Sequence, residues 1–238
     1  MKAIEANNYS RLSVIVPVYN EAGTIIELVD RVRDSVPGAE VVVVNDGSTD
    51  ETMSVLKTLK CEGIKIISVG QNRGKGFAVR RGIEAARGSI MVQIDSDLQF
   101  LPEEIPKLIS PIFGNEADIV FGSRYICDSG ATGANVSLLK RFGSYAVSGI
   151  VSLICGRNYT DIFAGFKAWR KDAMERISLA EDGFAYEAEI AIRARDKDIR
   201  IVELPIGYDR RKYGYSKLSI LKEMFILPLK LLFLWFRT

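Results

Sequence analysis

The sequence predicts an α/β fold, a doubly wound and mostly parallel sheet that is flanked by helices. Short apolar runs rich in Val and Ile alternate with helix-length segments of about 10–15 residues, which is the pattern of repeated βαβ units. Turn residues such as Pro37-Gly38 and Asn45-Asp46-Gly47 separate the two kinds of segment. Polar residues follow several of the apolar runs, and the ligand crevice of such a sheet lies beyond the carboxyl ends of its strands.

The first half of the chain provides most of the expected elements. The runs expected to be buried strands are Leu12–Val18, Glu40–Val44, Ile64–Val69, Ile90–Ile94 and Asp118–Phe121. Helices are expected over Glu21–Val36, after a cap at Ser48 or Thr49, over Gly74–Ala86 and over Pro102–Ile112. The residues that this order places at strand ends are Asn20, Asp46, Asn72 and Asp95. We expect them to face one crevice.

The pattern changes after Arg124. A mobile loop is expected over Tyr125–Asn135, followed by helices over Val136–Cys155 and Phe184–Arg195 and by strands over Phe163–Trp169 and Ile199–Leu204. These segments complete a single domain, which we expect to span residues 1–215.

Residues 216–238 are expected to form a separate amphipathic or membrane-associated helix. The apolar stretch Met224–Phe236 is shorter than the roughly 20 residues that span a bilayer. Its large apolar side chains exceed what one buried helix face requires, so we expect it to lie in a membrane interface. Packing on the domain is the alternative, and continuation of the native chain into membrane-spanning segments stays open.

Composition excludes several kinds of chemistry. The chain has 32 Lys and Arg against 30 Asp and Glu, a formal charge of +2, so no general affinity for nucleic acid is expected. It has no histidine, which excludes histidine-based triads and HExxH zinc sites. The three cysteines are odd in number and lack metal-ligand spacing. Since the N-terminus lacks the apolar core of a signal peptide, we expect the protein to face the cytoplasm.

The most informative motif is Asp95-Ser96-Asp97-Leu98-Gln99. Two carboxylates two residues apart follow a buried strand, so both can face the crevice. Hard divalent cations prefer oxygen ligands, and a nucleotide diphosphate leaving group needs such a cation to neutralise its charge. The motif therefore predicts a divalent-metal site with Gln99 as a further oxygen donor. The alternative is that Asp97 only caps a turn.

Three other segments bring polar groups toward the same crevice. Asp46 is placed to accept a hydrogen bond from a nucleotide base, although an Asx-turn explains Asn45–Ser48 equally well. Asn72–Gly76 lacks the spacing of a P-loop, so we expect Lys75 to begin a helix, with contact to a nucleotide as the alternative. Arg210–Lys217 concentrates cations around tyrosines and a glycine, which favours a loop that wraps an anion over a solvated face.

Together these motifs resemble family 2 glycosyltransferases, which have the GT-A fold. The segments that carry the resemblance are Val16–Glu21, Val44–Asp50, Asn72–Gly76 and Asp95–Gln99. Gly122–Tyr125, Asp161–Lys167 and Arg211–Leu218 are similar to the branch that transfers a sugar to a polyprenyl or dolichyl phosphate. One difference is Asn45, where many relatives carry a second Asp.

The resemblance implies a role for each group of residues. The donor site would comprise Pro17, Tyr19, Glu21, Asp46, Asp95, Ser96 and Arg124. Mg²⁺ or Mn²⁺ would be held by Asp95, Asp97 and Gln99. Arg211 and Lys217 would contact phosphates and, together with Asp97, form the catalytic set. Lys140, Arg141 and Ser144 would meet the acceptor phosphate, beside an apolar helix half that lies along the membrane.

The reaction that the resemblance implies is inverting transfer of a hexose from a nucleotide-sugar to a polyprenyl or dolichyl phosphate. GDP-mannose is the favoured donor because of the Asp95–Gln99 string, with UDP-glucose next and UDP-N-acetylglucosamine behind it. An anionic lipid phosphate attacks without a strong general base, which agrees with the absence of histidine. Glu187 and Glu189 would orient sugar hydroxyls, with a solvated helix face or a buried ion pair as the alternative.

Two other interpretations stay open. A glycosyltransferase that acts on a saccharide or protein hydroxyl would need a base, for which Asp182, Glu187 and Glu189 are the candidates. A non-catalytic nucleotide-binding membrane subunit is the other, and the intact pair of Asp95 and Asp97 counts against it. In the favoured interpretation the enzyme works at the cytoplasmic face of a membrane, where a membrane-protein subunit is a candidate partner.

Overall fold

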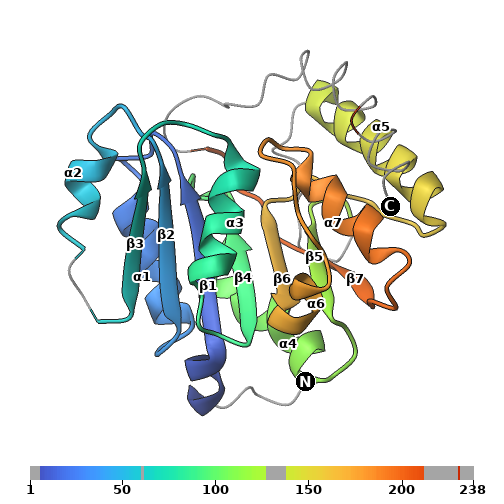
Figure 1. Cartoon of the computed structure of the whole chain (residues 1–238), viewed down its shortest axis with the longest axis horizontal. Helices are drawn as coiled ribbons and strands as arrows, with labels where there is room; N and C mark the ends of the chain where they lie inside the picture. The colour runs from blue at the N-terminus through green and yellow to red at the C-terminus, as the bar shows by residue number, and fades with distance from the viewer. Residues whose placement is uncertain (1–5, 60–61, 127–137, 212–229, 231–238) are drawn as a thin grey trace.

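The computed structural model describes residues 6–59, 62–126, 138–211 and 230 (Figure 1). At its centre is a seven-stranded sheet of order β3-β2-β1-β4-β6-β5-β7. The strands are β1 (Leu12–Val18), β2 (Glu40–Asp46), β3 (Ile64–Val69), β4 (Ile90–Ile94), β5 (Ile119–Ser123), β6 (Phe166–Arg170) and β7 (Ile201–Pro205). Only β6 pairs in the antiparallel sense, with β4 on one side and β5 on the other. The prediction of a mostly parallel sheet is therefore confirmed.

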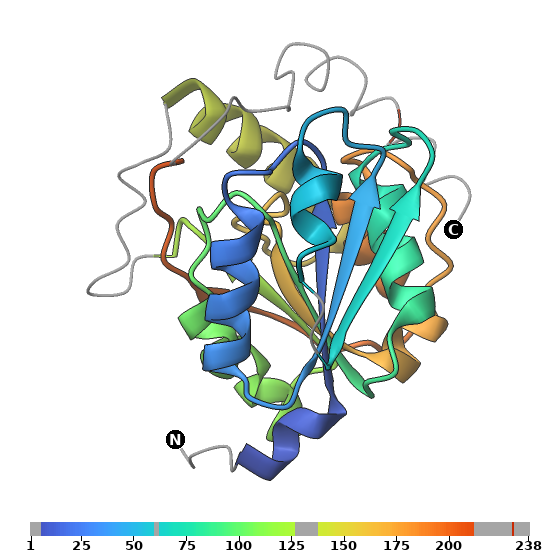
Figure 2. The same cartoon turned by 90° about the vertical axis from the view of Figure 1, so that its left-hand side faces the viewer.

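Helices cover both faces of the sheet, which gives three layers (Figures 1 and 2). One face carries α1 (Ile25–Ser35), α2 (Thr52–Leu56) and α4 (Ile105–Phe113), and the other carries α3 (Lys75–Ala85), α5 (Leu138–Cys155), α6 (Lys171–Glu175) and α7 (Tyr186–Ala194). The short 3-10 helices are η1 (Ala6–Arg11) and η2 (Pro102–Glu104). Neighbouring side chains of β1 alternate between the layers, because Val14 and Val16 pack with α1 whereas Ile15 packs with α3.

The elements agree with the sequence prediction except at their ends and in two short helices. The sequence did not predict η1 or α6, each of which is only one or two turns long. The helix cap predicted at Ser48 or Thr49 is wrong. The helix begins at Thr52, and its first backbone N–H bonds to the Asp50 carboxylate at 2.9 Å. Ser48 instead accepts a hydrogen bond from the Asn20 backbone at 2.9 Å, so the loops after β1 and β2 are tied together.

The C-terminal predictions fall largely outside the described residues. This applies to Lys217, to the expected helix of residues 216–238 except Lys230, and to most of the expected loop Tyr125–Asn135. The Lys230 Nζ lies 2.6 Å from a carboxylate oxygen of Glu181. Within the described part of the chain, no helix is both long and apolar enough to cross a membrane.

Candidate active site

The chain leaves β4 in a strained turn that carries the two predicted carboxylates. Leu98 adopts φ +60, a left-handed conformation that is uncommon for a leucine, and its side chain is buried. The Gln99 backbone N–H bonds to an Asp97 oxygen at 3.2 Å, which fixes that carboxylate. Gln99 also exchanges hydrogen bonds with Asp209, at 2.8 and 3.1 Å, so the segment that follows β7 docks on this turn.

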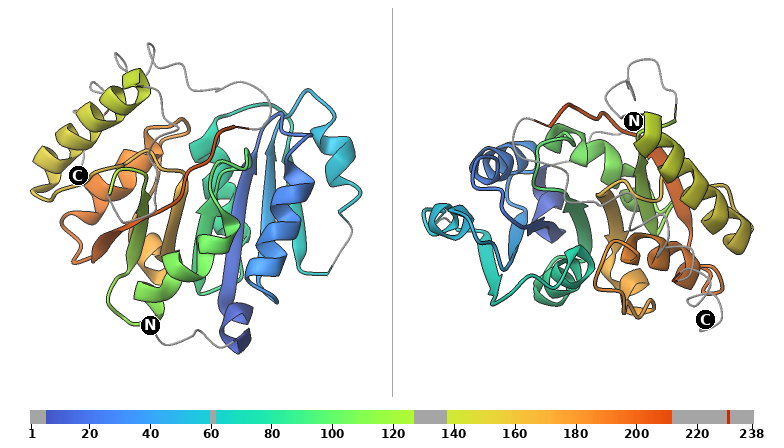
Figure 3. Two further views of the ribbon diagram at one scale, coloured as in Figure 1. Left: turned by 180° about the vertical axis from the view of Figure 1, so that it is seen from behind. Right: turned by 90° about the horizontal axis from the view of Figure 1, so that it is seen from above.

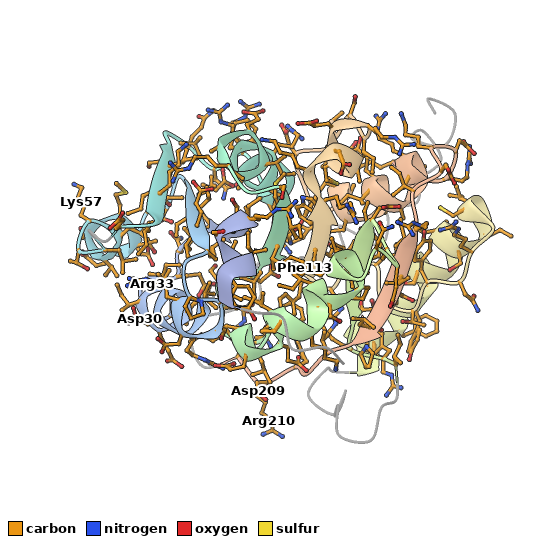
Figure 4. The ribbon with its side chains drawn as sticks, turned by 90° about the horizontal axis from the view of Figure 1, so that it is seen from below. Asp30, Arg33, Lys57, Phe113, Asp209 and Arg210 are labelled. Atoms are coloured by element: carbon orange, nitrogen blue, oxygen red, sulfur yellow. The ribbon has the colours of Figure 1, made fainter. Side chains whose placement is uncertain are left out.

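Two cations face the two carboxylates, one each. The Lys75 Nζ, from the first residue of α3, lies 2.7 Å from Asp95 Oδ1 and donates a hydrogen bond to Oδ2 at 3.0 Å. Arg211 pairs with Asp97 and also lies 3.3 Å from a Glu21 oxygen. Asp209 and Arg210, which precede Arg211, project from the surface (Figure 4). The carboxylates are thus neutralised by two side chains that come from different parts of the fold, the start of α3 and the segment after β7.

A second layer of charge lies beneath Lys75. The same Nζ contacts Glu187 Oε1, from α7, at 2.8 Å, and the other Glu187 oxygen pairs with Lys167 of β6. Both Glu187 and Lys167 are fully buried. Lys167 also donates to the carbonyls of Ile162 and Ala164, so it holds the turn that leads into β6. We call Asp95, Asp97, Lys75, Glu187 and Arg211 the Asp95 cluster.

Burial and pairing set the protonation of this cluster. Burial raises the pKa of Asp95, and Lys75 opposes that shift. Burial alone would lower the pKa of Lys75, but Asp95 and Glu187 outweigh it and the pKa is raised. Burial would raise the pKa of Glu187, but Lys167 and Lys75 outweigh it and the pKa is lowered. Lys75 is therefore a cation and Glu187 an anion at neutral pH.

The residues at the end of β4 fit a hard divalent cation. Asp95 Oδ1 is buried and lies 2.7 Å from the Lys75 ammonium, so a divalent cation would compete with that ammonium for the oxygen. Gly165 gives this carboxylate its room, because a Cβ there would lie 2.1 Å from Asp95 Oδ2. The described residues contain no group of three or more acidic, cysteine or histidine ligands. Asp95 and Asp97 would therefore need Gln99, water or substrate phosphates to complete the coordination sphere, as is usual for Mg²⁺.

A separate charge cluster lies at the end of β5. Arg124 makes a two-armed contact with Asp161, at 2.6 and 2.7 Å, and its backbone N–H bonds to the same carboxylate at 3.1 Å. Ser144 of α5 donates to Asp161 at 3.1 Å. Glu203 of β7 accepts hydrogen bonds from the Thr160 and Asp161 backbones at 2.8 to 3.1 Å. We call Arg124, Ser144, Asp161 and Glu203 the Asp161 cluster.

The predicted nucleoside residues lie at the ends of β1 and β2. Pro17 is buried within β1, Tyr19 is half-buried just after that strand, and Glu21 is buried beside Arg211. Asp46 is buried and accepts the backbone N–H groups of Arg73 and Gly74 at 3.0 and 2.8 Å. It therefore fixes the loop that starts α3, and the turn interaction expected in Asn45–Ser48 is made by Asn45, which accepts the Ser48 N–H at 3.1 Å.

The outer face of α5 carries exposed apolar side chains beside a cation. Phe142 is 68% exposed and Leu153 is 86% exposed, with Tyr145 and Ile150 between them. Arg141 is exposed and lies over the rings of Tyr125 and Tyr145. Figures 1 and 3 show the helix at the end of the sheet where β1 and β2 finish, on the side of β5 and β7. Lys140 belongs to α5, and its side chain lies outside the described residues.

Comparison with known proteins decides the family. Residues 13–177 match the model for "Glycosyl transferase family 2", which is well over half of the chain. The chain belongs to glycosyl transferase family 2. Its sheet and helices form the GT-A-like fold expected for that family.

The names of two relatives refer to lipid phosphates. The dolichol-phosphate mannosyltransferase of Pyrococcus furiosus is 36% identical over 214 residues, which cover 88% of this chain and 59% of that protein. The undecaprenyl-phosphate mannosyltransferase of Micrococcus luteus is 32% identical over 219 residues, which cover 88% of each.

Solved structures show the same fold at low identity. Glucosyl-3-phosphoglycerate synthase from Mycobacterium tuberculosis, in complex with UDP, gives a TM-score of 0.75 at 23% identity, covering 97% of this chain and 82% of that one. The same enzyme with Mn²⁺, UDP-glucose and glycerol 3-phosphate also gives 0.75, at 22% identity, covering 96% and 81%.

The three acidic residues that the sequence suggested as bases or as contacts to sugar hydroxyls are all paired with cations or backbone groups of the protein. Glu187 forms buried ion pairs with Lys75 and Lys167, which was one of the alternatives that the sequence left open for it. Glu189 is fully buried and accepts the Ala180 and Glu181 backbones at 2.9 to 3.0 Å as well as Arg193 at 2.7 Å. Asp182 pairs with Arg80 and Arg73. The described geometry therefore gives Glu189 and Asp182 roles in holding the 180–183 loop.

The sequence did not indicate the ion pairs that Asp161, Lys167 and Lys75 make in and beside the two clusters. Asp161 and Lys167 occurred only within a family-like segment, and Lys75 was expected mainly to begin a helix. A charged residue inside an otherwise buried strand was the available signal for Lys167, because such a residue is almost never buried without a partner. Nothing in the sequence indicated which partner it would find.

Proposed function

We propose that this glycosyltransferase moves a hexose from a nucleotide-sugar to a polyprenyl phosphate, with inversion at the anomeric carbon. The observation that carries the proposal is the paired carboxylates Asp95 and Asp97, which lie at the strand ends and are balanced by partly exposed cations. The two mannosyltransferases, at 36% and 32% identity, favour GDP-mannose as donor and a lipid phosphate as acceptor. UDP-glucose is the second candidate donor.

The chain's own residues would do three things. Glu21 and Asp46 line the ends of β1 and β2, where the nucleoside would lie. Asp95, Asp97 and Gln99 would hold Mg²⁺ or Mn²⁺, which would neutralise charge on the departing diphosphate. Arg211, which now pairs with Asp97 and Glu21, would turn its guanidinium to phosphate oxygens, a two-pronged contact for which arginine is suited. Lys217 would add a second cation there.

The bond changes need no general base. An anionic oxygen of the lipid phosphate attacks the anomeric carbon from one face, and the bond to the nucleoside diphosphate breaks on the other. Alignment and stabilisation of the leaving charge are therefore the main tasks of the protein. The described structure agrees with this, because the candidate bases Asp182, Glu187 and Glu189 are all engaged by cations or backbone groups. Their engagement counts against a hydroxyl acceptor.

The outer face of α5 supports an acceptor at a membrane. A stripe that includes Phe142 and Leu153 would enter the acyl boundary, with Arg141 and Lys140 at the headgroup level. Ser144, on the buried side of α5, and Arg124, which follows β5, both donate hydrogen bonds to Asp161. We place the reaction at the cytoplasmic face.

Flotation with anionic vesicles tests whether the outer face of α5 binds a membrane. Leu153→Ser should lower the fraction of protein bound to the vesicles, and unchanged binding would count against this face.

The test of the reaction uses two radiolabelled donors in parallel. GDP-mannose and UDP-glucose are offered with Mn²⁺ and a short polyprenyl phosphate, and with the matching polyprenol as the control acceptor. Label that enters the lipid phase only with the phosphorylated acceptor would support the proposal and identify the donor. Transfer to the alcohol or to a soluble saccharide, or no transfer from either donor, would overturn it.

A further inference from the structure

Lys75 occupies a position that the reaction proposed above does not explain. Its Nζ lies 2.7 Å from Asp95 and 2.8 Å from Glu187, and its side chain is 13% exposed. It therefore covers a carboxylate that a divalent cation would have to reach. Lysine is a compact point charge with no acceptor atom, so it cannot share a cation with Asp95 as a ligand would.

The backbone around Lys75 is fixed, and its ammonium is held between two carboxylates, Asp95 and Glu187. Gly74, the preceding residue, donates its N–H to Asp46 at 2.8 Å. Phe77, two residues further on, donates its N–H to the Asp182 carbonyl at 3.0 Å. Glu187, which holds the ammonium from below, is itself buried and paired with Lys167. Arg211 differs, because it reaches Asp97 from the segment after β7 and its side chain is more exposed than that of Lys75.

These contacts leave little net charge for a free metal ion to neutralise. The carboxylates Asp95, Asp97, Glu21 and Glu187 already face Lys75, Lys167 and Arg211. A divalent cation added alone would lie close to a fixed ammonium, and like charges at such distances in a partly buried site repel strongly. A nucleoside diphosphate would change this balance, because its phosphates attract both the metal and Arg211.

We propose that Lys75 is a built-in counter-ion of Asp95 that keeps the metal site weak until a nucleoside diphosphate is present. Metal and nucleotide then bind together, and a metal ion alone does not occupy the crevice. The inference rests on the proposed metal site at Asp95 and Asp97. In this arrangement Lys75 is a positioning residue whose charge sets the order of binding, and Glu187 tunes how tightly it is held.

The proposal predicts opposite effects for two neighbouring substitutions. Lys75→Met removes the competing charge and uncovers Asp95, so Mn²⁺ should bind the nucleotide-free protein roughly tenfold or more tightly. Glu187→Gln removes the second partner of the ammonium and leaves it to Asp95 alone, so Mn²⁺ should bind more weakly. A purely structural role for the network would weaken binding in both variants.

The experiment measures Mn²⁺ binding to the full chain by the loss of the free-ion electron paramagnetic resonance signal, with and without GDP or UDP. Lys75→Arg, which keeps the charge, should resemble the wild type, and Lys171→Met, at the other edge of the sheet, is the matched control. Thermal unfolding identifies folded variants, and if Lys75→Met does not fold, Lys75→Gln, which also removes the charge, takes its place.

Each outcome has a distinct meaning. Tighter nucleotide-free binding in Lys75→Met, with a smaller gain on adding nucleotide, would support the proposal. If the wild type binds Mn²⁺ only with nucleotide but Lys75→Met does the same, or if Glu187→Gln binds more tightly than the wild type, the role of Lys75 is wrong and the metal site stands. If no variant binds Mn²⁺ even with nucleotide, the metal site of the proposed function fails as well.

Discussion

The two charge clusters at the carboxyl end of the sheet differ in the exposure and the hydrogen bonding of their central carboxylates, Asp161 and Asp95. Asp161 has no exposed surface, and it receives hydrogen bonds from Arg124 and Ser144. In the Asp95 cluster, the Asp95 side chain is 25% exposed and both of its oxygens contact the Lys75 ammonium. The first arrangement is closed and holds α5 to the sheet, whereas the second keeps groups that can exchange their partners for a ligand.

The difference in exposure separates ion pairs that are able to bind a ligand from ion pairs that hold the fold together. The sequence suggested phosphate contacts for Arg124 and Ser144 as well as for Arg211. The structure engages Arg124 with a fully buried carboxylate, and the pKa of Arg124 is raised because Asp161 outweighs the effect of burial. Releasing that guanidinium would leave Asp161 buried without its charge partner, which is costly. The Arg211 side chain is more exposed than that of Arg124, so Arg211 can reach a phosphate more easily.

The largest expected effect is on catalysis, at the open cluster. Asp97→Asn should lower the transfer rate by about a thousandfold, which corresponds to roughly 4 kcal/mol, because the metal that would neutralise the leaving-group charge loses a carboxylate ligand. The free energy of unfolding should change by less than about 1 kcal/mol, since the Arg211 pair is partly solvated. Lipid-phase labelling and urea unfolding of the same preparation check both. A variant that retained near-normal transfer would remove Asp97 from the site.

The closed cluster should show the reverse pattern. Asp161→Asn leaves Arg124 buried without a charge partner, so the free energy of unfolding should fall by about 3–5 kcal/mol. Urea unfolding measures this, with Asp196→Asn, which removes an exposed pair with Arg195, as the matched control. If Asp161→Asn were as stable as the control and yet inactive, the cluster would have to be regarded as open to substrate.

The smallest expected effect is a dependence on pH at the edge of the closed cluster. Burial raises the pKa of Glu203 above its usual value, so the folded state binds this proton at a higher pH than the unfolded chain does. The contribution of Glu203 to stability is then greatest below its ordinary pKa and is lost as pH rises through the folded value. Because Gln does not ionise, the free energy of unfolding of the wild type minus that of Glu203→Gln should fall as pH rises through that window in urea unfolding. A rise of this value with pH would contradict the assignment.

The sequence was sufficient to predict the central strands because β1, β2, β4 and β5 are buried along their whole length. Runs such as Leu12–Val18 and Ile90–Ile94 are apolar except for Ser13 and Gln93, and every residue in them is buried in the structure. The position of Asp95 and Asp97 after such a run was equally readable, since parallel strands bring their carboxyl ends to one edge. Local turn chemistry was less reliable, as the wrong cap at Ser48 or Thr49 shows. That serine is recruited by Asn20, which comes 28 residues earlier.

The sequence by itself determined an α/β sheet, the position of the candidate site at the carboxyl ends of its parallel strands, and the family of this glycosyltransferase. Only the tertiary structure decided that β6 inserts antiparallel between β4 and β5, which carries Lys167 beneath the site. It also decided that Lys75 meets Glu187, 112 residues away, and that Arg124 meets Asp161. Burial is written locally, in the spacing of apolar residues, whereas a charge finds its partner only when the packed layers bring distant segments within a few ångströms.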